Sequence, residues 1–429
     1  MIDGTSKDAR LKTTMISRDS HLHHYVPRWY QKRFLRAGQK TLCYLDLKPD
    51  TVANGDFKYR KKALRFWEPA RCFCETDLYS LRFGDETTDV LEKRLFGMVD
   101  KRGAGAAEFF RYYDDFKEGT HEAYQSILSY LGAQRFRTPH GLDWLAKHMG
   151  LRDKNMALVA MQRLFQQYGT MWMEGVWEIV HARQSATKFI ISDVPVTFFN
   201  RNIIPGGYAY PGIDDFPMIG TRTIFPLSAD SCLIITHLQL VRNPWNNPTE
   251  RRVNARAFQQ TMANLTDIQF GRELEENEVL RINLILKRWA RKYIAAADQE
   301  SLYPERHLGN MHWTKLDHDW FLFPNVWKVG FTTGIMVGYQ SGGAWGMDEY
   351  GRNPWHPDYE DEERRAFERR RTDEGKKEWA KRRFGKSLAR VINQMREDTV
   401  SDLMMNRFLQ EGGLLPKQAD DADSRLDLE

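Results

Sequence analysis

The residues of this chain best suited to chemistry are two adjacent histidines beside a proline, in the run His23-His24-Tyr25-Val26-Pro27. Imidazole transfers protons and binds metals near neutral pH. Adjacent residues point in different directions on a helix or a strand, and Pro27 favours an extended backbone before it. We therefore expect one imidazole to face a site and the other to serve the structure. The alternative is that both are packed or hydrogen-bonded for structural reasons.

A second candidate is the carboxylate of Asp193, which follows an apolar stretch and precedes Pro195. At the end of a buried strand, Asp193 could ligate a divalent metal, position a histidine or act as a base. Ser192 would lie beside it in contact with substrate. Ser192 and Asp193 could instead build a capped turn through their own side-chain hydrogen bonds. Glu75 is a weaker candidate for a second metal-binding carboxylate.

A third candidate is the cationic end of an apolar stretch, Gln134-Arg135-Phe136-Arg137, which stops at Thr138-Pro139. Two arginines at a helix end could hold a phosphate or a carboxylate in a bidentate manner, with Gln134 beside them. The alternative is that Arg135 and Arg137 compensate the helix dipole or form an internal salt bridge to Glu92 or Asp193.

Together with Phe225-Pro226-Leu227-Ser228 and, less distinctly, Glu75 in Glu-Thr-Asp-Leu-Tyr, these stretches occur in an order and spacing that resemble a large bacterial family. The family is called domain of unknown function 4238. The likeness covers roughly residues 20–300. It implies one domain in which the motifs fold together, and it carries no established activity.

The amino-acid composition and the absence of several known motifs exclude some classes of protein. A net charge of +5 is too small for a protein dedicated to coating DNA, although a local basic groove is compatible with it. Four scattered cysteines favour buried thiols in a reducing compartment, and residues 1–20 lack the apolar core of a signal peptide. We therefore expect a cytoplasmic protein that does not enter a membrane. Walker A, dinucleotide-binding and H-E-x-x-H motifs and a nucleophile elbow are all absent.

The periodicity of apolar residues predicts an α+β fold, mainly helical, with a small antiparallel sheet built from hairpins around residues 176–236. One hairpin would pair 176–183 with 188–193, and a second would pair 221–226 with 232–236. Apolar residues recur at helical spacing in seven further segments, which we expect to be helices: 89–99, 122–134, 155–173, 250–265, 276–295, 359–384 and 388–408.

These patterns predict that the chain is divided into four parts. Residues 1–20 are expected to be a flexible leader, and 21–300 to form the family-like α+β domain. Residues 301–415 form a Trp-rich and helical C-terminal region, and the acidic stretch 416–429 is expected to be disordered.

Two hypotheses of function remain. The first is a nuclease-like phosphodiester hydrolase, in which His23 or His24 activates water or binds a divalent metal, Asp193 holds that metal, and Arg135 and Arg137 bind phosphate. Alternating aromatic and basic residues at 28–34 would suit a nucleic acid partner, and a role in phage defence or toxicity would suit this hypothesis. The second is a non-catalytic binding or sensor module, whose motifs form a structural polar network and whose Trp-rich C-terminal region binds a protein partner.

Overall fold

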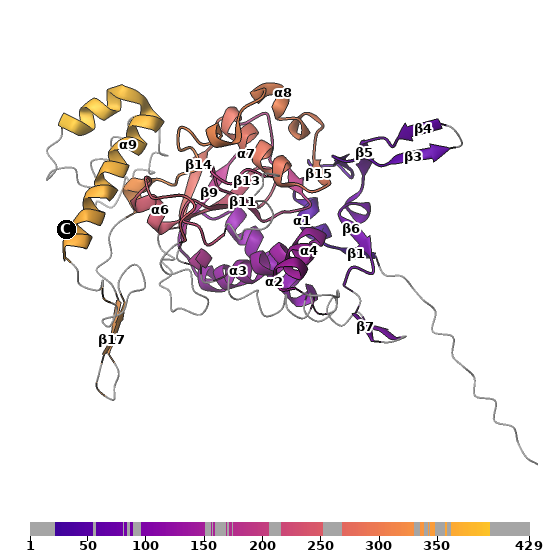
Figure 1. The fold of residues 1–429 in the computed structure, drawn as a ribbon, viewed down its shortest axis with the longest axis horizontal. Coiled ribbons are helices and arrows are strands. Elements are labelled where there is room, and N and C mark those ends of the chain that lie inside the picture. Colours follow the sequence, from indigo (N-terminus) through magenta and orange to yellow (C-terminus); the bar gives the residue numbers. More distant parts are fainter. Residues whose placement is uncertain are drawn as a thin grey trace, which may run out of the picture.

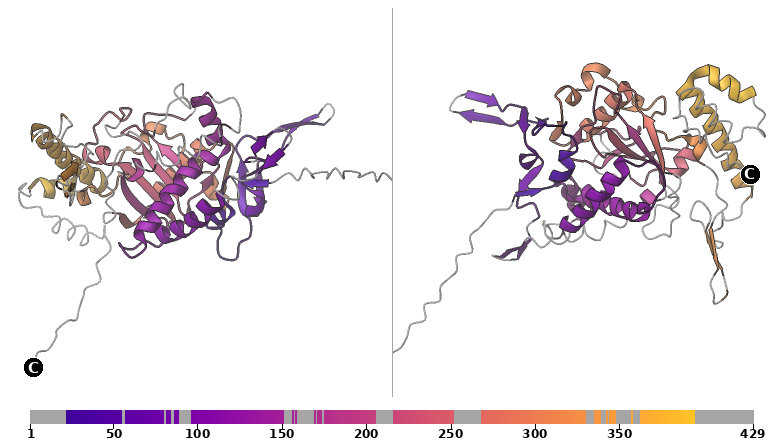
Figure 2. Two further views of the ribbon diagram at one scale, coloured as in Figure 1. Left: turned by 90° about the horizontal axis from the view of Figure 1, so that it is seen from below. Right: turned by 180° about the vertical axis from the view of Figure 1, so that it is seen from behind.

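The protein is described here from a computed structural model, shown in Figures 1 and 2. The residues that it describes are 22–54, 57–79, 81–83, 86–88, 96–150, 156, 158, 169, 171–173, 175–205, 216–251, 268–329, 335–338, 342, 344–347, 357 and 362–394. The expected leader and acidic tail, and the helices expected at 250–265 and over most of 155–173, lie outside these residues.

The centre of the molecule is a five-stranded sheet in the order β11-β12-β13-β9-β14. Its strands are β9 Gly175–His181, β11 Thr197–Phe199, β12 Arg222–Pro226, β13 Ser231–His237 and β14 Gln269–Glu273. Neighbours pair in antiparallel fashion, except that β14 runs parallel to β9. Because every residue of β11, β12 and β13 is buried, both faces of this sheet are covered.

A second sheet has four strands in the order β10-β15-β2-β5. They are β10 Ile191–Ser192, β15 Tyr293–Ala296, β2 Leu42–Asp46 and β5 Leu64–Trp67. Four two-stranded pairs accompany the two sheets: β1 Leu22–His24 with β6 Cys74–Thr76, β3 Thr51–Asn54 with β4 Phe57–Arg60, β7 Leu81–Phe83 with β8 Glu86–Thr88, and β16 Ile335–Gly338 with β17 Ala344–Met347.

Helices cover the five-stranded sheet on two sides (Figures 1 and 2): α2 Gly97–Arg111, α3 Thr120–Arg137 and α4 Pro139–His148 on one, and α7 Glu276–Trp289 on the other. Trp177 of β9 meets the first group, with ring centroids 5.8 Å from Phe110 and 4.4 Å from Tyr124. Short helices complete this part of the chain: α1 Arg28–Lys32, α6 Leu238–Arg242 and α8 Glu305–Leu308, with 3-10 turns at Pro69–Arg71, Glu300–Leu302, Trp313–Lys315 and Val326–Lys328.

The expectation of a mainly helical fold with one small sheet is wrong, because the α+β fold contains both a five-stranded and a four-stranded sheet. The four-stranded sheet joins segments as distant as β2 and β15, whose register pairs Leu45 with Ile294. Short strands that pair over such separations leave no hairpin signal in the sequence. Local periodicity therefore underestimated the sheet.

The two predicted hairpins have opposite outcomes. The hairpin of β12 and β13 is confirmed, with Pro226 paired to Cys232 across the turn. The hairpin between 176–183 and 188–193 is wrong. Both edges of β9 are taken by β13 and β14, while β10 pairs with β15 in the other sheet. Bends occur at 183–184 and 186–187, where the turn was expected, but the Phe189 amide donates to the Ala229 carbonyl instead of to β9.

Beyond residue 300 the chain completes the core instead of standing apart from it. The side chains of Leu302, Trp313, Leu316, Phe321 and Leu322 are buried in the same apolar cluster as the two sheets. The final helix, α9 Glu362–Gln394, has a break at Gly385, where φ is +79°. The sequence predicted two helices with a boundary at 384–388, which matches this break.

No helix in the part of the chain that the structure describes is long and apolar enough to cross a membrane.

Two glycines in α2 offer a test of the packing between α2 and α3. A Cβ added at Gly103 would lie 2.5 Å from Cδ2 of Tyr130, whereas one added at Gly105 would meet nothing within 4 Å. Gly103→Ala should lower the free energy of unfolding by about 1–3 kcal/mol through overpacking. Gly105→Ala should raise it by about 0.5–1 kcal/mol through helix propensity. Urea denaturation of both variants measures the difference, and equal effects would contradict this packing.

Candidate functional site

The two histidines of the opening motif lie in the strand β1, which pairs with β6 so that His23 faces Glu75 and His24 faces Cys74. His23 is 3% exposed, its Nδ1 accepts a hydrogen bond from the Tyr79 amide at 3.1 Å, and its ring stacks on that of Tyr79. Because Nδ1 accepts, it carries no proton, and His23 packs in the interior.

His24 points the other way and is half-buried, with Nε2 3.1 Å from the carbonyl oxygen of Ala70. Burial lowers the pKa of His24, so its imidazole is neutral at neutral pH. Glu75 is exposed. Both histidines thus contact the backbone of neighbouring segments.

Two residues that follow the opening motif, Tyr30 and Gln31, connect this part of the chain to other segments. The Tyr30 hydroxyl donates to the carbonyl of Pro226 at 2.6 Å. Gln31 is fully buried, and its Nε2 donates to the carbonyls of Val26 and Cys72. Since each of these bonds satisfies a buried carbonyl, the aromatic and amide side chains of the motif hold the chain together.

Gln134 and Arg137 form a second buried connection at the end of α3. Gln134 donates from Nε2 to the Tyr25 carbonyl at 2.8 Å, and its Oε1 accepts from Nε of Arg137 at 2.6 Å. Arg137 is 1% exposed and forms an ion pair with Asp100 of α2, with 2.8 Å between NH1 and Oδ1. The hydroxyl of Tyr79 donates to the carbonyl of Arg137. Arg137 thus forms an internal salt bridge, as in the alternative that the sequence offered, but its partner is Asp100, which is neither of the two expected acids.

Arg135 differs from its neighbours in the same motif. Its side chain is 4% exposed, and its guanidinium lies 4.8 Å from the ring centre of Phe198 and 5.8 Å from that of Trp144. The guanidinium has no hydrogen bond or ion pair with any residue that the structure describes, and its Nε is fully buried. Arg135 is therefore a buried cation whose contacts are aromatic.

Asp193 follows β10, where its carboxylate accepts three backbone hydrogen bonds. The amides of Arg291, Lys292 and Tyr293 donate to it at 2.8, 2.7 and 2.9 Å. Burial raises the pKa of Asp193, and the three amides oppose that shift. The hydroxyl of Ser192 accepts from the Val194 amide at 3.1 Å, which is the capped turn that the sequence offered as the alternative.

The structure therefore joins the family motifs, but through the backbone. Neither His23 nor His24 forms a hydrogen bond or ion pair with Asp193, whose carboxylate is occupied by amides. Among the described residues, no group of three or more His, Cys, Asp or Glu side chains is arranged to hold a metal ion. The metal-binding role of Asp193 and Glu75 thus has no support from the geometry.

Among the residues that the sequence did not single out, Phe198 contacts Arg135, and His140 is close enough to feel the charges of both Arg135 and Arg291. Phe198 lies on β11, five residues after Asp193. His140 is in the first turn of α4, and Arg291 ion-pairs with Asp143 of that helix. Burial, together with the charges of Arg135, Arg291 and Lys147, lowers the pKa of His140 to about 3. Only Phe198 had a sequence signal, its place in an apolar run after the Asp193 motif.

The fold and this set of contacts define a class of α+β proteins in which polar motifs join distant segments around a buried arginine. The family model described as "Protein of unknown function (DUF4238)" matches residues 22–300, and the chain belongs to that family. Neither the curated proteins nor the solved structures contain a match to this chain.

The carboxylate of Asp193 allows a direct test of its structural role. Asp193→Asn leaves at least one buried amide facing an NH₂ group, and it should lower the free energy of unfolding by about 2–3 kcal/mol. The control is Asp143→Asn, because Asp143 is 51% exposed and its ion pair with Arg291 contributes about 0–1 kcal/mol. Urea denaturation compares the two, and an Asp193 variant as stable as the control would refute the role.

Proposed function

We propose that this protein is a binding module for a phosphate-bearing ligand, and that Arg135 receives the phosphate. The observation that carries the proposal is the burial of Arg135 without an anionic partner among the described residues. Leaving a buried charge unpaired costs several kcal/mol, so a guanidinium at this position is expected to have an anion that binds it. The planar fork of an arginine matches the geometry of phosphate oxygens.

The surroundings of Arg135 favour an anion. Arg291 and Lys147 add positive charge near His140, and the low pKa of His140 follows from burial together with these cations. A neutral imidazole neither cancels nor increases that charge. The ring faces of Phe198 and Trp144 hold the Arg135 side chain in place through cation–π contacts while leaving its N–H groups to a ligand.

Binding is favoured over hydrolysis because the side chains expected to do the chemistry are engaged elsewhere. His23 accepts a backbone amide, and Asp193 accepts three. One observation keeps phosphodiester hydrolysis as a second candidate. A bound phosphate would offset the field of Arg135 and raise the pKa of the neighbouring His140, and so make its imidazole a better general base.

We further propose that the ligand is single-stranded nucleic acid, because a basic hairpin projects from the body beside this region. The hairpin β3–β4 extends outward with β5 at its base (Figure 1). Residues 51–71, which contain this hairpin and β5, have six lysines and arginines against the two acids Asp56 and Glu68, a formal charge of +4. Tyr59 and Phe66 are 54% and 56% exposed, as aromatic platforms for bases would be.

Charged contacts connect this hairpin with the surroundings of Arg135. Asp50 at its base ion-pairs with Lys61 of the hairpin and with Lys292, at 3.3 and 3.6 Å. Arg291, the residue before Lys292, ion-pairs with Asp143 of α4. A strand lying along the hairpin would thus have basic side chains on its way towards Arg135.

Arg135 and Arg137 form a matched pair for testing the phosphate site. Both are buried and two residues apart, but only Arg137 has an ion pair. Arg135→Met should leave the melting temperature without phosphate unchanged or higher, and should reduce the stabilisation given by added inorganic phosphate. Arg137→Met should lose about 3–5 kcal/mol of stability, because it leaves the carboxylate of Asp100 without its ion-pair partner and removes one hydrogen bond of Gln134. Thermal melting with phosphate or chloride measures both effects. A phosphate-induced shift as large in Arg135→Met as in the unaltered chain would contradict the proposal.

The hairpin is tested by removing three exposed charges together, Lys58, Arg60 and Lys62, each to glutamine. Affinity for a single-stranded oligonucleotide should fall, and the slope of log K against log salt should decrease by about 2, since each phosphate contact contributes about 0.7. The control replaces Arg369, Arg370 and Lys381 on α9, which are also exposed.

Equal losses in the two triple variants would mean that only net charge matters, and would contradict a role for the hairpin. Gel analysis of the oligonucleotide after each titration separates the two candidate functions, because a binding module leaves it intact and a hydrolase shortens it.

A further inference from the structure

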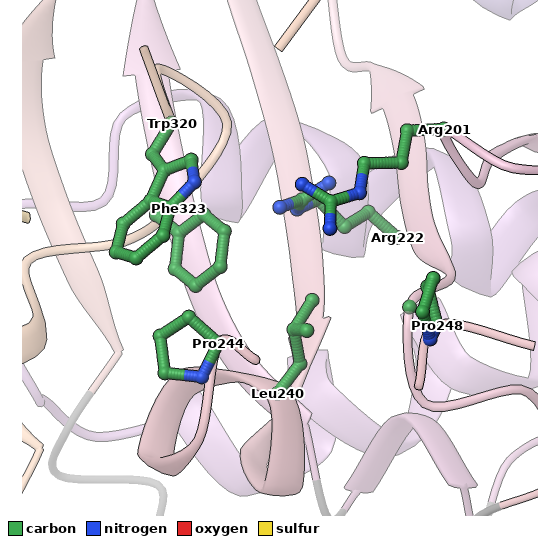
Figure 3. Close-up of a pocket in the computed structure, with 8 residues that line it drawn as sticks. Arg201, Arg222, Leu240, Pro244, Pro248, Trp320 and Phe323 are labelled. Atoms are coloured by element: carbon green, nitrogen blue, oxygen red, sulfur yellow. The ribbon is translucent and has the colours of Figure 1, made fainter. Parts of the chain in front are cut away.

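A pocket outside the family motifs lies between the five-stranded sheet and the segment that follows residue 316 (Figure 3). Arg201 and Arg222 form one side of the pocket, and the guanidinium of Arg201 points towards that of Arg222. Trp320 and Phe323 line the opposite side, with Leu240 and Pro244 at the floor. The family match ends at residue 300, so the aromatic side of this pocket comes from a part of the chain that the match does not cover.

The pocket contains more positive charge than its acids neutralise. Arg222 is 3% exposed and ion-pairs with the buried Asp317, with 2.8 Å between NH2 and Oδ2. The Nε of Arg222 is buried without a hydrogen-bond partner. Arg201 is exposed and forms no hydrogen bond or ion pair with a residue that the structure describes. Among the described residues, a carboxylate thus pairs with Arg222 but not with Arg201, and the Oδ1 of that carboxylate also accepts from the Leu322 amide.

The electrostatics of Arg222 reflect the same imbalance. Its pKa is lowered by burial and by the charge of Arg201, and Asp317 opposes both effects. An added anion between the two arginines would relieve their mutual repulsion and would accept from their unpaired N–H groups.

The aromatic side is held in a conformation that costs free energy. Trp320 has φ at +60°, which residues with a Cβ rarely adopt. Its ring stacks on Phe323 with centroids 4.9 Å apart, and Phe323 in turn lies 4.5 Å beneath the guanidinium of Arg222. Strained backbone of this kind persists where surrounding contacts enforce it, and it is concentrated at binding sites. Here the strained residue positions an apolar surface directly beside the buried arginine.

We propose that this pocket binds a small organic oxyanion, whose charged group bridges Arg201 and Arg222 and whose apolar part lies against Leu240, Pro244 and Phe323. A carboxylate and a phosphate monoester share this chemistry, since both offer two oxygens to an arginine fork. The site is separate from Arg135 and does not depend on the ligand proposed there.

The experiment is isothermal titration calorimetry of the full chain with phenyl phosphate, benzoate and inorganic phosphate at constant ionic strength. All proteins carry Arg135→Met, so that binding at Arg135 does not contribute. Arg201→Gln is the test variant, because Arg201 is exposed and its loss leaves no buried group unpaired. Arg306→Gln is the matched control, an exposed arginine that ion-pairs with Glu300 at the surface.

We expect phenyl phosphate or benzoate to bind, and the tighter of the two identifies the anionic group. Its affinity should fall at least tenfold in Arg201→Gln and stay unchanged in Arg306→Gln. Failure of both organic anions to bind, or equal binding in the two variants, would overturn the site. Inorganic phosphate binding as tightly as phenyl phosphate would overturn the apolar part of the proposal.

Discussion

The fold depends on one physical constraint, that buried main-chain groups need hydrogen-bond partners where segments meet outside regular pairing. In this protein, polar side chains supply these hydrogen-bond partners. Gln134 binds the carbonyl of Tyr25, Gln31 binds those of Val26 and Cys72, and Asp193 binds the amides of three successive residues. Each of these bonds links segments that are far apart in sequence or closes a turn between strands. Removing one partner would leave the other unsatisfied in the interior, which costs more than the bond itself contributes.

This constraint changes the meaning of the polar motifs. Histidine, aspartate and arginine in ordered patches suggest an active site when they are considered as a list of reactive groups. In the structure, His23, Asp193 and Arg137 have partners that belong to the protein itself. Arg135 stands in the same motif with the same burial, yet it has only aromatic contacts among the described residues. This contrast between two arginines of one motif is the basis of the phosphate site that we propose at Arg135.

The segment after residue 300 is part of the same physical unit. Trp313 and Phe321 complete the main apolar core, and the indole of Trp313 donates to the carbonyl of Asn200 at 2.9 Å. Asp317 compensates Arg222 of the central sheet. Trp320 and Phe323 then line the pocket beside those charges. Residues beyond the family match thus contribute both to the main core and to the lining of this pocket.

The sequence by itself determined the features that depend on neighbouring residues. Apolar periodicity located α3, the turn residues located the β12–β13 hairpin, and the break at Gly385 fell where the pattern predicted it. It placed the end of α7 too late, because the apolar stripe continues to Tyr293 although 293–296 form β15. It also identified which motifs belong together. Only the tertiary structure decided that β9 pairs with β13 and β14, and that Arg137 has a carboxylate while Arg135 has none. Strand partners and buried charge pairs depend on contacts between residues far apart in the chain, and local patterns contain no information about which distant group will be adjacent.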